Sequence, residues 1–496
     1  MTIKHPYPYT TRIAMKKSLL TLAILGTATL SAHAGIVLYG EVDAGFSFNH
    51  AKTTFTSGQP IIMPVMPDNH HAPTFKISTR GLGAGGSHSI VPTYLSSNTS
   101  RSNSFKFGDG LLGANKIGLR GEEDINGMTV GFKLENGFNL SSGDLSTPGK
   151  IFDREARLYV RNNFGELALG RFGGLGSATG SYDVFFANAD AFDGGDNLIP
   201  WAYATTGRMD NSIAYQSPEV MGLQGTLMYS FNKDGEQKDK AKDNDRYAGA
   251  ALTFKQDRFA LVGSAEVLLR DRETKNFYKT TRYEDPINGL SNRFLDPVDY
   301  KNGCMFNLGG NVDFDTFKLF ASGQISRHIN LDEIQTGFSE EDRRHVFTSG
   351  IGDDNDYTPE QKGTIVDHLS TYSGQMQFNG YALSLGSSIS IHQDTLTIGA
   401  YYGSYKTAGH QELPNYLGAD NIEFSFPVLK KGKIKTFGIA ARLEHPLSKR
   451  TTLYTGAGYG ENRFRYSYDD YTEHVDCTAK LKHRIGQIYF GLNHKF

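Results

Sequence analysis

The sequence predicts an all-β fold, namely a transmembrane antiparallel β-barrel of about 16 strands with short turns at one end and long loops at the other. Three observations support this prediction. Hydrophobic residues make up only 38 % of the 496 residues, apolar and polar residues alternate with period two, and very short connections alternate with very long ones. A helical membrane protein is excluded, because beyond the N-terminus no run approaches the ~20 apolar residues that a spanning helix needs.

The first element is a targeting segment over residues 1–34. A basic pair at 16–17 precedes the apolar run 19–25 and the small-residue motif Ala32-His33-Ala34. This order is typical of a cleavable secretory signal. We expect translation to start at Met15 and cleavage to follow Ala34, which leaves 35–496 as a single exported barrel domain. An uncleaved N-terminal membrane anchor is the alternative.

Strands are indicated next by alternation. Phe437, Ile439, Ala441 and Leu443 alternate with small or polar residues, and the segments 395–402 and 247–254 repeat the pattern. Period two means that one face of the strand is apolar and the other is not. In a soluble sandwich the apolar faces would meet inside, whereas in a membrane barrel they face lipid and the polar faces line water.

The connections differ sharply in length. Short ones lie at 123–127, 163–165, 255–257, 314–316 and 392–394, and long polar ones at 50–103, 173–207, 271–301, 330–370 and 407–433. Outer-membrane barrels have this asymmetry, with tight periplasmic turns and long extracellular loops. A closed barrel also satisfies every backbone N–H and C=O group in hydrocarbon.

The last element is a closing strand that ends on an aromatic residue. Phe490, Leu492 and Phe496 share one face of this strand. A terminal ring there fits the aromatic girdle at the membrane interface. We expect this strand to be the part that the barrel-assembly machinery binds, although any β protein can end in Phe.

No catalytic or metal-binding motif accompanies these strands. The sequence contains no G-x-S-x-G or H-E-x-x-H motif, and its 15 histidines are scattered. Cys304 and Cys477 form neither a disulfide framework nor a zinc pattern, and whether they pair stays open. The net charge of −2 gives no basis for nucleic-acid binding. We therefore expect no enzyme activity, no cofactor, no metal and no nucleic-acid partner.

Five stretches of the sequence resemble the corresponding stretches of one protein family. They are LYGEVDAG (38–45), NKIGLRGEEDINGMTVGFKLENGF (115–138), FGELALGRF (164–172), SPEVMGLQGTLMYSF (217–231) and the terminal GLNHKF. They are similar to the Gram-negative general porins, especially the neisserial and other β-proteobacterial type. The resemblance implies a 16-stranded barrel in the outer membrane, usually a homotrimer in contact with lipid, that passes ions and small hydrophilic solutes by passive diffusion.

The resemblance also implies where the channel is narrowed. Porins of this family fold the third long loop into the lumen, and here that loop is 173–207. Its acidic residues include Asp190, Asp193 and Asp196, with Asp183 before them. Rows of fixed charges are how pores discriminate between ions. The facing cations, matched to the family's wall positions, are Lys116, Arg154 and Arg208, and Arg120 joins them because it shares strand parity with Lys116.

Some assignments stay open. Arg157 and Arg161 are alternatives to Arg154, because simple alternation would turn Arg154 toward lipid or a subunit interface. Glu41 would weaken an anion preference if it faced the lumen. A solute-specific channel is one alternative function, with Tyr182, Phe185, Phe186 and Trp201 as possible contacts. A non-conducting adhesin that uses the long loops is the other.

Overall fold

The computed structural model describes residues 35–64, 88–196, 199–271, 282–284, 291–293, 301–336, 376–408, 416–417, 423–424, 428–470 and 475–496. The predicted targeting segment, 1–34, lies outside the described residues. Within the described part no helix is long and apolar enough to cross a membrane.

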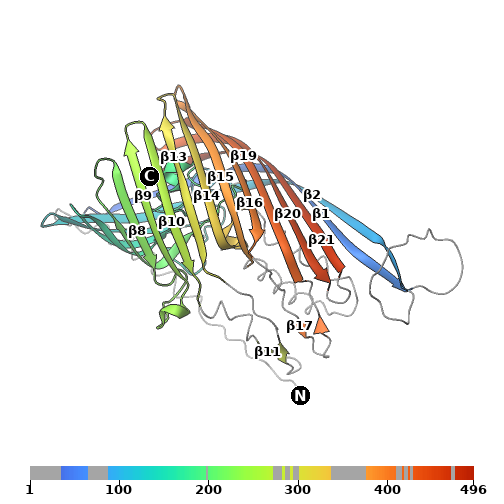
Figure 1. Ribbon diagram of the computed structural model, residues 1–496. Helices are drawn as coiled ribbons and strands as arrows, with labels where there is room; N and C mark the ends of the chain where they lie inside the picture. The colour runs from blue at the N-terminus through green and yellow to red at the C-terminus, as the bar shows by residue number, and fades with distance from the viewer. Residues whose placement is uncertain are drawn as a thin grey trace, which may run out of the picture.

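One large antiparallel sheet contains nearly all of the regular structure (Figure 1). Its strands are β1 (Val37–Pro64), β2 (His88–Asp109), β3 (Lys116–Ile125), β4 (Met128–Gly137), β5 (Glu155–Asn162), β6 (Gly165–Gly173), β7 (Arg208–Gln216), β8 (Leu223–Ser230), β9 (Arg246–Gln256), β10 (Phe259–Leu269), β13 (Gly303–Asp313), β14 (Phe317–Asn330), β15 (Gln377–Ile391), β16 (Asp394–Thr407), β19 (Val428–Pro446), β20 (Thr451–Asp470) and β21 (Val475–Lys495). Two small sheets pair β11 (Arg282–Glu284) with β12 (Ser291–Arg293) and β17 (Tyr416–Leu417) with β18 (Glu423–Phe424). The short helices are α2 (Phe186–Ala189), η2 (Ala241–Asp243) and η3 (Leu331–Glu333).

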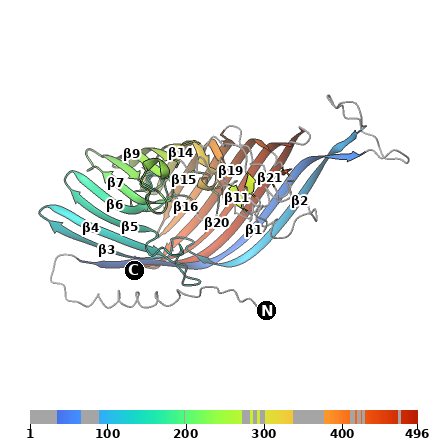
Figure 2. The ribbon, with the colours of Figure 1, turned by 90° about the horizontal axis from the view of Figure 1, so that it is seen from below.

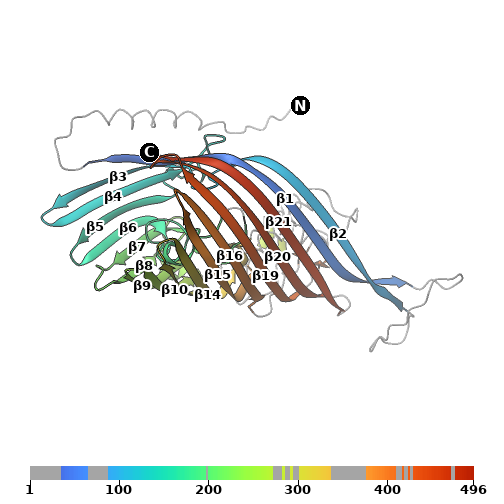
Figure 3. The ribbon, with the colours of Figure 1, turned by 90° about the horizontal axis from the view of Figure 1, so that it is seen from above.

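The sheet closes through β1. One edge of β1 pairs with β21, and the other pairs first with β3, over 37–41, and then with β2, over 44–64. Strands β2 and β3 therefore follow the same edge of β1 as one strand that is interrupted at 110–115. Counted in this way the barrel has 16 antiparallel strands, which confirms the predicted fold class. Figures 2 and 3 show the strands curving around one interior.

The interruption between β2 and β3 is held by one buried carboxylate. Asp43 accepts hydrogen bonds from the backbone N–H groups of Leu111, Leu112 and Gly113 at 3.0, 3.2 and 3.0 Å. The Tyr454 hydroxyl donates to the same carboxylate at 2.6 Å. The backbone N–H groups that have no strand partner at this break are thus hydrogen-bonded to a carboxylate inside the barrel, as buried polar groups require.

Exposure alternates along the strands and identifies the two faces. On β21, Ile488, Phe490 and Leu492 are 58, 51 and 45 % exposed, whereas Tyr489 and Asn493, on the opposite face, are buried. A contiguous apolar outer face and a polar inner face are the pattern of a barrel in lipid. The terminal Phe496 lies on the outer face against Gly40 of β1, and the two residues exchange backbone hydrogen bonds at 3.1 Å, which closes the barrel.

The predicted short turns are confirmed. Two to three residues separate β3 from β4, β5 from β6, β9 from β10, β13 from β14 and β15 from β16. In the first of these turns Asn126 and Gly127 have φ angles of 52° and 82°. Positive φ at both central residues gives the twist that joins two antiparallel strands tightly.

The stretch 50–103, predicted to be a loop, differs in the structure. β1 continues to Pro64 and β2 begins at His88, so much of it is a long hairpin (Figure 3). The reason is pairing on both edges of β1, which reaches Gly58↔Thr478 on the β21 side. These backbone hydrogen bonds form regardless of side-chain polarity, and alternation of apolar residues is therefore not needed there.

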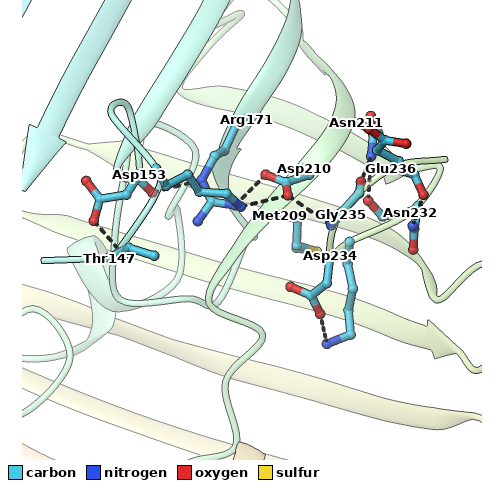
Figure 4. A network of polar contacts seen from close by, with 12 residues as sticks. Thr147, Asp153, Arg171, Met209, Asp210, Asn211, Asn232, Asp234, Gly235 and Glu236 are labelled. Carbon is cyan, nitrogen blue, oxygen red and sulfur yellow. Dashed lines mark hydrogen bonds and ion pairs between the residues drawn. The ribbon is translucent and has the colours of Figure 1, made fainter. Parts of the chain in front are cut away.

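A polar network ties the loops at the long-loop end together (Figure 4). Arg171 donates to Asp210 at 2.5 Å and to the carbonyl oxygen of Asp153 at 2.8 Å. Lys150 pairs with the same Asp210 carboxylate at 2.9 Å, and the Gly235 N–H donates to it at 3.1 Å. Residues from the β4–β5 and β8–β9 loops thus meet at one aspartate of β7. Cys304 on β13 is a free cysteine, and the side chain of Cys477 lies outside those described.

Candidate functional site

The loop between β6 and β7, residues 174–207, lies inside the barrel (Figure 2). Its backbone is bound to side chains of the inner wall. Gln324 of β14 donates to the carbonyl of Ala204 at 2.9 Å and accepts from its N–H at 2.8 Å. The Tyr405 hydroxyl of β16 donates to the carbonyl oxygen of Ala202 at 2.7 Å. The predicted third loop therefore folds inward and is fastened to the wall.

Glycines on the inner face let this loop approach the strands closely. A Cβ on Gly438 would lie 2.2 Å from the carbonyl oxygen of Pro200, and a Cβ on Gly460 would lie 2.4 Å from the Pro200 Cδ. Neither distance is tolerable for a real side chain, so the absence of Cβ at these positions is what admits the loop. Other inner-face glycines that touch the loop are Gly309, Gly386, Gly399, Gly403 and Gly458.

The aromatic residues of the loop form its own core. Phe186 packs edge-on against Trp201 and Tyr203, with ring centroids 5.1 and 5.3 Å apart. Tyr182, Phe185 and Phe186 are at most 1 % exposed. Side chains that are buried in this way stiffen the loop and do not present rings to a passing solute.

Asp190 organises the tip of the loop. Its Oδ2 atom accepts the backbone N–H groups of Phe192, Gly194 and Gly195 at 3.3, 2.9 and 2.8 Å. The Tyr401 hydroxyl of β16 donates to Oδ1 at 3.0 Å. Burial raises the pKa of this carboxyl, and these donors oppose the rise because they favour the charged form.

The other two predicted aspartates differ in exposure. Asp196 is 1 % exposed and accepts a hydrogen bond from the Tyr489 hydroxyl of β21. Asp193 is exposed, at a backbone φ of 55° in the turn that Asp190 caps. Asp183, earlier in the loop, is buried, and the desolvation of its carboxyl raises its pKa well above the ordinary value. Of these four residues, only Asp193 is exposed, and the surrounding loop still desolvates its carboxyl in part, which raises its pKa.

The predicted cations lie on β3, on β7 and just before β5. Lys116 pairs with Glu41 at 2.6 Å, so Glu41 does face the interior. The Arg120 guanidinium is exposed and stands over the Tyr39 ring at 5.5 Å. Arg208 is half-buried, with Arg154 among its electrostatic neighbours.

Simple alternation along β5 would place Arg154 on the outer face, but its side chain points into the barrel. Its Nε atom donates to Glu135 of β4 at 2.7 Å, and Glu135 lies on the inner face. The reason is that β5 begins at Glu155, so Arg154 precedes the strand and its side chain is not bound by strand parity. The two alternative residues, Arg157 and Arg161, also point inward. Arg157 pairs with Glu166 and Arg161 with Glu122, each at 2.9 Å.

Sequence reasoning missed Arg442 of β19. This side chain lies over the ring of Phe192 at 4.9 Å and donates to Glu444 at 2.9 Å. It therefore borders the tip of the loop from the β19 side. Its place on the polar face of 436–444 was visible in the sequence, but nothing in the sequence linked that face to residue 192.

Taken together, the interior is a polar passage with fixed charges of both signs. Cations on β3, β5 and β7 and the exposed Asp193 can act on ions through the electric field without forming bonds to them. Among the described residues, no group of His, Cys, Asp or Glu is arranged to hold a metal ion.

Comparisons with known proteins find related sequences and solved structures. A model of the Gram-negative porin family matches residues 21–465. An outer membrane porin protein of Bordetella pertussis is 26 % identical over 319 residues, which cover 62 % of this chain and 68 % of that protein. The major outer membrane protein P.IA of Neisseria meningitidis is 23 % identical over 95 % of this chain and 100 % of its own. A solved anion-selective porin from Comamonas acidovorans aligns with 94 % of this chain and 100 % of its own, at 16 % identity and a TM-score of 0.48.

Proposed function

Because this chain belongs to the Gram-negative porin family, we propose that its outer-membrane channel is narrowed by the loop 174–207 and selects ions at that loop by charge. The chain is a channel for passive diffusion and not an enzyme. The proposal concerns the residues that act on the permeating ions.

Asp193 supplies the negative side of the constriction. One observation carries this assignment, namely that Asp190 and Asp196 are buried and hydrogen-bonded whereas Asp193 is exposed. A carboxylate that already accepts several donors has little free capacity for a passing cation. Asp190 and Asp196 therefore act on the ions mainly by fixing the conformation of the loop. Their charges act on the ions only from the buried side of the loop.

The positive side consists of Arg120, Arg208, Lys116 and Arg154. Arg120 has the most open position of the four, because its guanidinium is exposed and stacked on a ring. Lys116 and Arg154 share their charge with Glu41 and Glu135, which weakens their field in the lumen. Arg120 and Arg208 are thus the cations that contribute most to anion passage.

Ion selectivity of single channels in a planar bilayer tests this assignment. Asp193→Lys should shift the cation/anion permeability ratio by about tenfold toward anions, because the fixed charge at the constriction changes by two units. The control Asp239→Lys makes the same charge change on an exposed residue of the β8–β9 loop. If Asp193→Lys and Asp239→Lys give the same reversal potential, Asp193 has no place in the constriction.

The same recording separates the alternatives. An absence of conductance steps would favour a non-conducting adhesin. Saturable block by one solute would favour a solute-specific channel, which the burial of Tyr182, Phe185 and Phe186 does not support.

We further propose a homotrimer, as the family implies. Its support is the family membership together with a cluster of exposed rings on the outer face. In this cluster Phe46 is stacked on Phe105 and tilted against Phe490, with centroids 5.4 and 5.7 Å apart. Native mass spectrometry of the detergent-solubilised protein should give three times the chain mass. A monomer mass under conditions that preserve known trimers would contradict it.

Export and assembly complete the proposal. The segment 1–34 directs secretion and is removed after Ala34, and the strand that ends in Phe490, Leu492 and Phe496 engages the barrel-assembly machinery. These three side chains are 51, 45 and 42 % exposed on the outer face, which leaves them accessible to a partner. N-terminal sequencing of the protein from outer membranes should begin at Gly35, and deletion of Phe496 should lower the amount of folded protein there.

A further inference from the structure

The residues that follow β14 fold into the barrel. The helical turn η3 begins with a capping box, in which the side chain of Asn330 accepts the N–H of Glu333 and the Glu333 carboxylate accepts the N–H of Asn330 at 3.0 Å. Such a box fixes the direction in which the chain enters the turn. The chain then reaches Thr336, whose carbonyl oxygen accepts a hydrogen bond from the side chain of Asn462 on β20. Because β15, β16 and β19 lie between β14 and β20 in the sheet, residues 331–336 pass over the inner face of these strands. We call residues 331–336 the strap.

The strap pairs with the loop 174–207 as a short antiparallel ribbon. Three backbone N–H···O=C hydrogen bonds join the two segments, from Thr205 to Glu333 at 2.9 Å, from Gln335 to Tyr203 at 2.8 Å and from Ala202 to Gln335 at 2.9 Å. The first two of these bonds flank the pair Ala204↔Ile334. Gln324 of β14 also binds the backbone of Ala204. This part of the loop is therefore bound both to the barrel wall and to the strap.

The inner wall next to the strap is apolar. Ile434, Phe464 and Leu481 are neighbours across β19, β20 and β21 near the long-loop end, and they are at most 4 % exposed. Leu331 and Ile334 of the strap belong to the same buried cluster. Apolar side chains are unfavourable in contact with the water of a lumen, and covering them stabilises the segment that does so. The strap thus has a defined seat inside the barrel and occupies lumen space in front of these strands.

An ion pair fixes the strap at its other side. Arg270, which follows β10, donates to both carboxylate oxygens of Glu333 at 2.8 and 2.6 Å. The Arg270 side chain is only 3 % exposed. A bidentate pair of this kind fixes orientation as well as distance. Removal of one partner from a buried pair is costly, because the charge of the other partner stays buried. Glu333 is therefore the residue on which the position of the strap depends most.

We propose that the strap is a second constricting element of the channel, which occupies part of the lumen and holds the loop 174–207 in its inward position. Glu333 and Ile334 are its positioning residues, since one binds the strap to Arg270 and the other pairs it with Ala204. They act on permeation through the strap and the loop. The inference rests on the proposed constriction at this loop and adds to it a segment from a distant part of the chain.

Single-channel conductance of the full-length protein in a planar bilayer tests the proposal. E333A should conduct about twice as much as the wild type, because the strap leaves the lumen and the passage becomes wider. E236A is the matched control. It removes the same side chain from an exposed position in the β8–β9 loop, at the same end of the barrel. Its conductance should equal that of the wild type, and an equal rise in both variants would overturn the proposal.

A disulfide across the ribbon separates release of the strap from misfolding. Ala204 and Ile334 form a non-hydrogen-bonded antiparallel pair, because the backbone hydrogen bonds lie on either side of them. The Cα atoms of such a pair are about 4.5 Å apart, which a disulfide can span. The variant E333A/A204C/I334C/C304S/C477S should therefore form this link under oxidising conditions. Its oxidised form should have the wild-type conductance, and its reduced form about twice that value.

The outcomes distinguish the strap from the channel itself. Equal conductance of the oxidised and reduced forms overturns the proposal, and so does failure of the disulfide to form. An equal response of the C304S/C477S parent to the reductant also overturns it. If E333A prevents assembly, A204C/I334C/C304S/C477S carries the same comparison, because Cys in place of Ile334 already leaves the seat of the strap underfilled. A wild type without conductance steps would contradict the proposed channel, whereas a conducting wild type with no redox difference in the variant contradicts the strap alone.

Discussion

The carboxylate of Asp190 is expected to control the local stability of the loop that narrows the channel. Asp190→Ala removes the acceptor for three backbone N–H groups and for the Tyr401 hydroxyl. A hydrogen bond to a charged group contributes about 1.5–3 kcal/mol, and buried donors that are left unpaired add to the loss. Because water will reach part of the site, we expect the loop to lose about 3–5 kcal/mol of stability, close to the largest effects of single substitutions.

Trp201 reports on this loop directly. It is the only Trp in the chain and packs on Phe186 at 5.1 Å and on Tyr203 at 6.0 Å. In a urea titration its fluorescence should change at a lower urea concentration in Asp190→Ala than in the wild type. Far-UV circular dichroism, which reports on the barrel, should change little.

Tyr401→Phe provides the graded comparison, since it removes one donor and should cost about 1 kcal/mol. Asp239→Ala, at an exposed loop position, should have no effect on either signal. If the Trp201 transition keeps the wild-type midpoint in Asp190→Ala, Asp190 does not hold the loop and the reasoning is wrong.

Two further predictions concern the same loop. Burial and the negative charges of Asp193 and Glu266 raise the pKa of Asp183 in the folded protein. The carboxyl therefore does not reduce the free energy of unfolding below its unfolded-state pKa, and reduces it increasingly as the pH rises toward its folded-state pKa. Asp183→Asn should therefore be more stable than the wild type at about pH 7 and equal to it at about pH 3, as urea midpoints at the two pH values would show. Gly460→Val places a side chain 2.4 Å from Pro200 Cδ, so the loop should move into the lumen, with a loss of about 1–3 kcal/mol and a lower single-channel conductance. Gly225→Val, where the nearest atom is 3.8 Å away, should leave conductance unchanged, and equal conductance in both variants would contradict the steric argument.

The fold class could be predicted because its signals are local. Alternation along 395–402 and 436–444 reports which face of a strand is apolar, and the turn at Asn126 and Gly127 reports its own geometry. Each signal needs only a few neighbouring residues. The long β1–β2 hairpin was missed for the same reason, because it depends on pairing with β21, more than 400 residues away in the chain.

The candidate site could be predicted in its parts but not in its roles. The sequence, through its resemblance to a family, indicated the loop and its aspartates. It could not show that Asp190 caps a turn and binds Tyr401, 211 residues later, or that Asp196 binds Tyr489. It also could not direct Arg154 inward by alternation, because that rule applies only within a strand.

The sequence by itself determined that the chain forms a membrane barrel with one apolar and one polar face, since period-two alternation fixes the side of every residue within its own strand. The tertiary structure decided which residues of different strands meet. Strand register placed β21 beside β1, and the fold of the inner loop left Asp193 exposed while Asp190 and Asp196 became buried. Register and loop packing depend on contacts between residues far apart in the chain, and no local pattern encodes them.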